Sequence, residues 1–210
     1  MLAQLAEGML KSIGIFIWTM VLSIPLGMVV AFGRMSKNVV LSTIIKIYIS
    51  IMRGTPLMLQ LLVWYFGPYY LFGVNVGGFR YPAIILAFAF NYAAYFAEIF
   101  RSGIQSMPKG QYEAAEVLGY SKAQTFFKII LPQVIKRVMP PVTNETITLV
   151  KDTSLAYALA YTEMFSLAKQ ISAAETSFTP LFVAGVFYYI FNFIIAELMS
   201  FIEKKLDYYK

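Results

Sequence analysis

QYEAAEVLGYSKAQTFFKIILPQ, the sequence of Gln111–Gln133, is the longest soluble-looking stretch in an otherwise apolar chain. Alanine and glutamate favour a short helix over Lys109–Leu118, and Gly119 is the residue type expected just beyond its end. Ser121 then begins a second helix, in which Gln124 completes a capping box. A helix–glycine–helix knob of this size, flanked by apolar segments, is too small to fold alone. We therefore expect it to lie against a partner.

The composition of the chain is that of an integral membrane protein. Of its 210 residues, 59% are hydrophobic and 13% are charged, whereas a soluble domain is about 45–50% apolar and about 25% charged. The chain contains no cysteine and no histidine, so a metal site or general base would have to use carboxylates. This argues against a hydrolase or a zinc enzyme. The sequence therefore predicts no catalytic residue, no metal site and no cofactor bound by this chain.

Five stretches are predicted to cross the membrane. Ser12–Gly33 carries no charge and is long enough for a bilayer core of about 30 Å, so we interpret it as a retained helix rather than a signal peptide. The second span lies between residues 39 and 68. Tyr81–Phe100 is the third span, Ile129–Tyr161 the fourth and Thr176–Ala196 the fifth.

The second and fourth spans are irregular. Val39–Met52 either begins the second membrane helix or lies along the interface, because Lys46 interrupts it. The chain then breaks at residues 53–56, and the next helix is expected to end near Gly67-Pro68, before an external loop over Tyr69–Gly78. Prolines and charges predict a broken fourth span that faces protein or a water-filled cavity. These interrupting residues are Pro132, Pro140, Pro141, Glu145, Lys151 and Asp152.

Basic residues indicate the orientation, because they concentrate on the cytoplasmic side of membrane proteins. With five spans, one side collects most of them: Arg34, Lys37, Lys46, Arg101, Lys109, Lys122, Lys128, Lys204, Lys205 and Lys210. The other side collects Lys11, Arg80 and Lys169. We therefore expect an all-α, polytopic protein with one transmembrane domain over residues 1–210. Its N-terminus lies outside, and its C-terminus and the knob at residues 109–133 lie in the cytoplasm of a bacterial-type cell.

Three motifs carry a resemblance to a known family. EAA at residues 113–115, Gly119, and the ILP pattern at Ile129, Leu131 and Pro132 resemble the EAA loop of ATP-binding-cassette (ABC) importer permeases. RGTPL at residues 53–57 and KDTSL at residues 151–155 are similar to stretches of the polar amino-acid branch. The resemblance covers about half the chain. It implies a permease subunit that forms the path of an ATP-driven amino-acid importer.

The resemblance also implies partners. An external binding protein would capture the amino acid, two permease chains would form the path, and two ATPase subunits would supply the driving force. The chain contains no G-x-x-x-x-G-K-[ST] phosphate loop, so ATP and magnesium are expected on the ATPase. The sequence leaves open whether the second permease chain is identical to this one, and which amino acid is carried.

In this family the EAA loop docks into a cleft of the ATPase, which assigns roles within the knob. The resemblance implies that Glu113 accepts a hydrogen bond or pairs with a basic residue across the interface. It also implies that Ala114 and Ala115 allow close approach and that Gly119 permits the turn.

Polar residues inside the membrane are the candidates for the substrate site. They are Asn144, Lys151, Asp152, Ser154 and Glu163. Lys151 and Asp152 either neutralise each other or bind the carboxylate and the ammonium of an amino acid. Glu163 has no obvious local partner: it either faces water in an external loop or reads the charge of a basic substrate. Glu145 is expected to cap a helix or to pair with Arg137 or Lys136.

Two other functions compete with the importer. A membrane channel or scaffold with a cytoplasmic interaction knob would also suit a broken helix, but it would need no ATPase dock. A membrane enzyme would need a constellation of carboxylates or hydroxyls, and none is evident.

Overall fold

The computed structural model describes residues 1–206, and within that range every regular element is helical. The helices are α1 (Leu2–Arg34), α2 (Val39–Gly54), α3 (Leu57–Phe72), α4 (Arg80–Gln105), α5 (Lys109–Val117), α6 (Lys122–Gln124), the π-helix η1 (Thr125–Ile130), α7 (Leu131–Asp152), the 3-10 helix η2 (Thr153–Leu159), α8 (Met164–Glu175) and α9 (Thr179–Lys205). The all-α prediction is thereby confirmed. Lys210, one of the basic residues assigned to the cytoplasmic side, lies outside the described residues.

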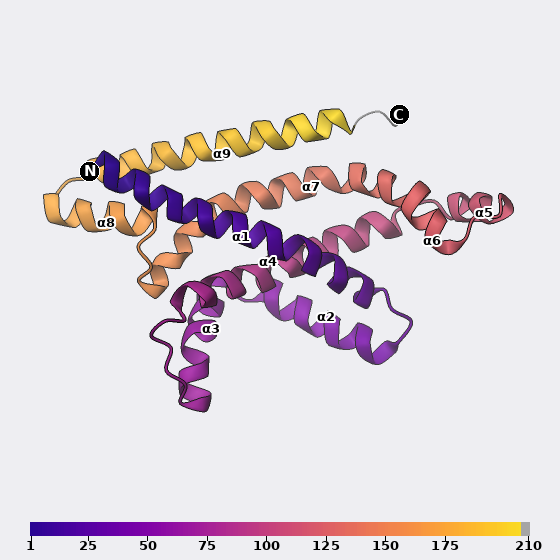
Figure 1. Ribbon diagram of the computed structural model, residues 1–210, viewed down its shortest axis with the longest axis horizontal. Coiled ribbons are helices and arrows are strands. Elements are labelled where there is room, and N and C mark those ends of the chain that lie inside the picture. Colours follow the sequence, from indigo (N-terminus) through magenta and orange to yellow (C-terminus); the bar gives the residue numbers. More distant parts are fainter. Residues whose placement is uncertain (207–210) are drawn as a thin grey trace.

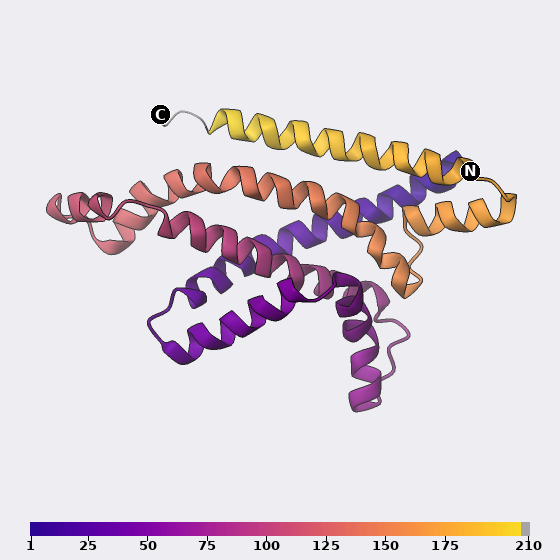
Figure 2. The ribbon, with the colours of Figure 1, turned by 180° about the vertical axis from the view of Figure 1, so that it is seen from behind.

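The long helices run along one direction and separate two ends of the molecule (Figure 1). The knob formed by α5, α6 and η1 lies at one end, together with the end of α9. The N-terminus and α8 lie at the opposite end. From behind, α1 is again seen crossing α4 and α7, while α2 and α3 lie on the far side from α9 (Figure 2).

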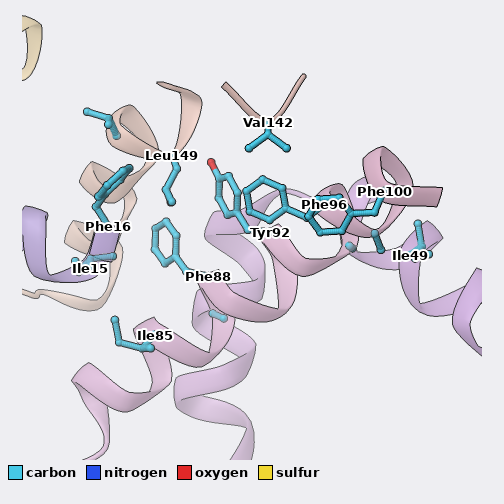
Figure 3. Packing of buried hydrophobic residues seen from close by; sticks show 14 of the residues in the cluster. Ile15, Phe16, Ile49, Ile85, Phe88, Tyr92, Phe96, Phe100, Val142 and Leu149 are labelled. Carbon is cyan, nitrogen blue, oxygen red and sulfur yellow. The ribbon is translucent and has the colours of Figure 1, made fainter. Parts of the chain in front are cut away.

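The core is built around α4, which supplies many of the fully buried side chains. The rings of Phe88, Tyr92, Phe96 and Phe100 follow one another along this helix between residues of α1 and α7 (Figure 3). At Gly27, α1 crosses α4 so closely that an added Cβ would lie 2.8 Å from Cβ of Phe96. A side chain at position 27 would therefore force these two helices apart.

Three described helices are long and apolar enough to cross a membrane: α1, α4 and α9. The pair α2 and α3 would be a fourth span, although it is bent by 111°. The fourth span expected from the sequence, Ile129–Tyr161, corresponds to α7, which is 22 residues long but too polar to qualify by composition. Such a helix is tolerated at membrane depth where protein or a cavity covers it.

Two expected helix ends are wrong. We expected Pro140 and Pro141 to interrupt the fourth span, but α7 runs unbroken through both. Two adjacent prolines remove hydrogen bonds only locally, and the helix geometry changes instead in the flanking π and 3-10 segments, η1 and η2. Similarly, Gly67 and Pro68 lie inside α3 rather than at its end.

The end of α3 is set by a glycine in a left-handed conformation. Gly73 has φ +66° and its N–H donates to the carbonyl of Tyr69 at 2.8 Å. Glycine adopts this conformation without the steric cost that a side chain would bring. The loop after α3 is therefore shorter than the predicted Tyr69–Gly78, because it begins at Gly73.

One helix was not predicted. α8 occupies Met164–Glu175, where the sequence analysis expected only a loop between the fourth and fifth spans. Its apolar residues pack with Leu5 and Met9 of α1 and Ala184 of α9 in a second, smaller core that contains Met164 and Ala168. With 12 residues it is too short to cross a bilayer, and it lies beside the N-terminal ends of α1 and α9.

Candidate functional site

The break between α2 and α3 is held by two buried amides. The side-chain N–H groups of Gln60 and Asn91 donate to the carbonyl of Met52 at 3.0 and 2.9 Å. Gln60 also donates to the carbonyl and hydroxyl of Thr55 at 3.2 and 2.8 Å, and Asn91 donates to the Gln60 carbonyl oxygen at 3.0 Å. These bonds satisfy carbonyls that the broken helix leaves free inside the protein.

Next to this break lies a cavity of about 380 Å³ between α4 and α7. Tyr92 of α4 donates its hydroxyl to Oδ2 of Asp152 at 2.8 Å. The carboxyls of Asp152 and Glu145 line this cavity, and no basic side chain does. The lining residues are Thr55, Pro56, Leu57, Asn91, Tyr92, Tyr95, Glu145, Thr148, Asp152 and Leu155.

A second cavity of about 450 Å³ continues from the first toward the knob. Tyr95 and Glu145 line both cavities, so the two spaces are neighbours. The second cavity has a different charge pattern, because Arg53, Arg101 and Arg137 line it together with Glu98 and Glu145. It includes an ion pair of Arg101 and Glu98, whose nitrogen and oxygen lie 2.6 Å apart, while Arg53 lies over the ring of Tyr95.

Only one of the five predicted substrate residues lines these cavities. That residue is Asp152. Asn144 and Lys151 are exposed on α7 but line neither cavity, and the hydroxyl of Ser154 donates to the carbonyl of Lys151 at 2.8 Å. The structure therefore gathers Asp152 with a set of residues that the sequence analysis did not select.

The two descriptions offered for the surroundings of Glu163, no local partner and an exposed loop, are both wrong. Glu163 is fully buried and caps the N-terminus of α8. Its carboxyl accepts hydrogen bonds from the backbone N–H groups of Phe165 and Ser166 at 2.7 Å each, and from the hydroxyl of Tyr188 at 3.1 Å. It lines neither cavity. Its geometry is that of a structural cap that joins α8 to α9.

Several cavity residues were missed because they are ordinary residue types in an apolar helix. Asn91, Tyr92 and Tyr95 occupy one side of α4, at spacings of one, three and four residues. This helical spacing is the signal that would have found them. Glu145 was considered only as a cap or as a partner of Arg137 or Lys136. Arg137 instead donates to the carbonyl and hydroxyl of Ser106, at 2.8 and 2.9 Å.

The knob has the local structure that its sequence predicts. α5 ends before Gly119, whose φ of +76° is the left-handed conformation expected there. The hydroxyl of Ser121 accepts from the N–H of Gln124 at 3.3 Å, and the Gln124 side chain accepts from the N–H of Ser121 at 2.9 Å. This is the predicted capping box. Partial burial raises the pKa of Tyr112, which lines a pocket inside the knob.

The four predicted coupling residues differ in exposure. Glu113, Ala114 and Gly119 are exposed, so a partner can reach them. Ala115 is only 1% exposed and packs inside the chain. Its role in coupling stays a prediction, and the face that a partner can reach directly holds Glu113, Ala114 and Gly119.

Comparison with known proteins shows the family. Residues 23–208 match the family described as the inner membrane component of binding-protein-dependent transport systems. The chain belongs to this family. The permease is thus a membrane component of an ABC transporter, and not an enzyme; the ATPase is a separate subunit in such systems.

The permease is similar along nearly its whole length to amino-acid transport proteins. It is 36% identical to the L-cystine transport system permease protein TcyB of Bacillus subtilis (strain 168), over 98% of this chain and 87% of the relative. It is 37% identical to the putative glutamine transport system permease protein GlnP of Rickettsia typhi, over 95% and 91%.

The fold also matches a solved transporter. The crystal structure of an amino-acid ABC transporter with histidines superposes with a TM-score of 0.87 and 28% identity, over 97% of this chain and 94% of the other. This supports a permease rather than the channel or scaffold alternative. Among residues 1–206, no group of three or more acidic side chains is placed to hold a metal ion.

Proposed function

We propose that the permease, acting as one transmembrane domain over residues 1–210, moves a polar amino acid through the two neighbouring cavities between α4 and α7. The observation that carries the proposal is the pair of carboxyls, Asp152 and Glu145, in a cavity without a basic side chain. Inside a membrane protein such a cavity favours a cation. The α-ammonium group of an amino acid supplies one, and a basic side chain supplies a second.

The second cavity supports passage toward the knob. Glu145 and Tyr95 belong to both cavities, so a substrate group bound at Glu145 can move between them without leaving a polar surface. In this second cavity, Arg53 and Arg137 offer partners for the α-carboxylate of the substrate. The first cavity is lined by acidic groups only, and the second is lined by both acidic and basic groups. We propose that a zwitterion is held in the first cavity and released through the second.

Two sources support the choice of substrate class. The carboxyls of the first cavity favour a cationic group. The relatives are named as transport proteins for cystine and glutamine, and the solved neighbour is a transporter with histidines. We therefore propose a polar amino acid, with basic ones bound best. Glu163, Lys151, Asn144 and Ser154 are not included in the substrate site, because none of them lines either cavity.

We propose that the exposed face of the knob, with Glu113, Ala114 and Gly119, docks on the ATPase. This face lies at the end of the molecule that holds the C-terminal basic residues Lys204 and Lys205 (Figure 1). The orientation supported by the charges puts this end in the cytoplasm and the N-terminus outside. The proposed assembly has two permease chains, identical or different, two ATPases that bind ATP and magnesium, and an external binding protein.

Uptake by proteoliposomes tests the substrate assignment. The permease is reconstituted with its partner ATPase and binding protein, and the uptake of labelled arginine, lysine, histidine, glutamine and cystine is compared with that of leucine and glutamate. We expect the basic and polar amino acids to be taken up and leucine and glutamate to be excluded. Equal uptake of glutamate would contradict an acidic substrate site.

A further inference from the structure

The knob is fastened to α7 by a reciprocal pair of amides. Nε2 of Gln111 in α5 donates to Oε1 of Gln133 in α7 at 2.8 Å, and Nε2 of Gln133 donates to Oε1 of Gln111, also at 2.8 Å. Gln133 donates in addition to the carbonyl of Ile129 at 2.7 Å. Both side chains are partly buried, so water competes only in part for these bonds. We call Gln111 and Gln133 the amide strut.

A second contact ties the same helix to the start of the knob. Arg137, one turn after Gln133 on α7, donates to the carbonyl and the hydroxyl of Ser106 at 2.8 and 2.9 Å. Ser106 directly follows α4, and α5 begins three residues later at Lys109. One face of α7 therefore holds both the entry to α5 and α5 itself.

The chain between α5 and α7 is a weak mechanical link without these contacts. It contains a left-handed glycine, Gly119, and the π-helix η1 at Thr125–Ile130. A π-helix is rare and interrupts the regular hydrogen-bond pattern of the α-helix. If a displacement of α5 were transmitted only along the chain, the backbone would bend at Gly119 and η1, and α7 would move little.

We propose that the amide strut transmits movement of the knob to α7, so that Gln111 and Gln133 are positioning residues for coupled transport. This inference rests on the proposed docking of α5 on the ATPase. It follows because α7 carries Glu145 and Asp152, and a displaced α7 changes both cavities. Coupling between separate sites requires an element that both sites bias, and α7, held by the strut, is that element.

The test uses a mutant cycle in the complete transporter. The variants are Gln111→Leu, Gln133→Leu, their combination, and the charged pair Gln111→Glu with Gln133→Lys. Gln170→Leu is the matched control, because Gln170 is an exposed glutamine of α8 at the other end of the molecule. Each transporter is purified with its ATPase and reconstituted, and the amino acid taken up per ATP hydrolysed is measured.

We expect either single leucine variant to keep its ATPase but to lower uptake per ATP roughly three- to tenfold. The double leucine variant should be no worse than a single one, because the two residues act as one contact. The charged pair, Gln111→Glu with Gln133→Lys, restores an attraction between the same two positions. It should return the ratio to within about twofold of the unaltered protein. Gln170→Leu should leave it unchanged.

Three results would overturn the inference. Unchanged uptake per ATP in both single variants would show that the strut transmits nothing. Additive losses without recovery in the charged pair would show that the two residues act separately. Loss of the ATPase from the single variants would show that Gln111 and Gln133 serve docking rather than transmission. Failure of the unaltered protein to bind any ATPase would instead refute the proposed docking, which the co-purification step detects first.

Discussion

The half-buried Asp152 and the buried Glu163 show how the surroundings of a residue, rather than its type, decide its role. Asp152 meets one hydroxyl, from Tyr92, and keeps part of its surface toward a cavity. Glu163 is closed in by two backbone N–H groups and the Tyr188 hydroxyl. A carboxylate that is fully hydrogen-bonded has no acceptor left for a substrate, whereas one at a cavity surface has. The sequence placed both in the substrate site because neither partner set is visible in it.

Asp152→Asn tests the substrate site directly. Removing the charge takes away a charge-assisted hydrogen bond worth about 1.5–3 kcal/mol, so KM for uptake should rise roughly ten- to hundredfold. Uptake kinetics in proteoliposomes provide the measurement. Glu7→Gln is the control, because Glu7 forms an exposed ion pair with Lys11 at 3.0 Å and such pairs contribute little. An unchanged KM in Asp152→Asn would remove this residue from the site.

Glu163→Ala should affect stability and leave substrate affinity alone. The variant loses the N-cap of α8, at a cost of about 1–2 kcal/mol, and it leaves a buried hydroxyl and two N–H groups short of a partner. We expect a lower Tm in detergent, with KM for arginine changed by less than about twofold. The Tm of Glu163→Gln, which keeps one acceptor oxygen, should lie between those of the unaltered protein and Glu163→Ala. A large rise in KM at an unchanged Tm would return Glu163 to the substrate site.

At the scale of elements, the sequence predicted a helix or a break correctly where neighbouring residues in the chain determine it. Residues 53–56 break the second span as expected, and α5, its glycine and the capping box appear where the sequence placed them. The errors arise where packing decides. Pro140 and Pro141 sit in a helix that its neighbours hold, and α8 forms because Glu163 caps it and because α1 and α9 cover its apolar side. In both cases the packing involves other helices, so it cannot be read from the segment itself.

The turn of the knob provides a matched pair of variants. An added Cβ would meet no atom within 4 Å at either Gly119 or Gly110, but only Gly119 has a positive φ. Gly119→Asp should therefore strain the turn by about 1 kcal/mol and displace the exposed face of α5. Gly110→Asp adds the same charge near the N-terminus of α5, where an acidic residue is favourable.

We expect Gly119→Asp to reduce the amount of ATPase that co-purifies with the permease, and Gly110→Asp to retain it. Substrate-stimulated ATP hydrolysis should follow the same order, because it requires the docked subunit. Normal hydrolysis in Gly119→Asp would mean that the geometry of this turn is not needed for docking.

For the whole molecule, the sequence predicted the fold class and the family but not the proposed path, and the orientation in the membrane stays a prediction. Composition and charge indicate an all-α membrane protein, and the EAA, RGTPL and KDTSL stretches indicate a permease. The path depends on which faces of α4 and α7 meet. That register places Tyr92 against Asp152, 60 residues apart in the chain, and places Tyr95 and Glu145 in both cavities. Such pairings over long distances in the chain have no signature in a single sequence.

We propose that one chain joins an amino-acid path to a partner ATPase. The most direct measurement is the ATPase activity of the permease reconstituted in lipid with its ATPase, with and without the binding protein and a panel of amino acids. We predict that basic and polar amino acids, presented by the binding protein, stimulate hydrolysis, and that Asp152→Asn weakens this response to the substrate. An ATPase that binds the permease but hydrolyses ATP at the same rate with every amino acid, or one that does not bind at all, would contradict the claim.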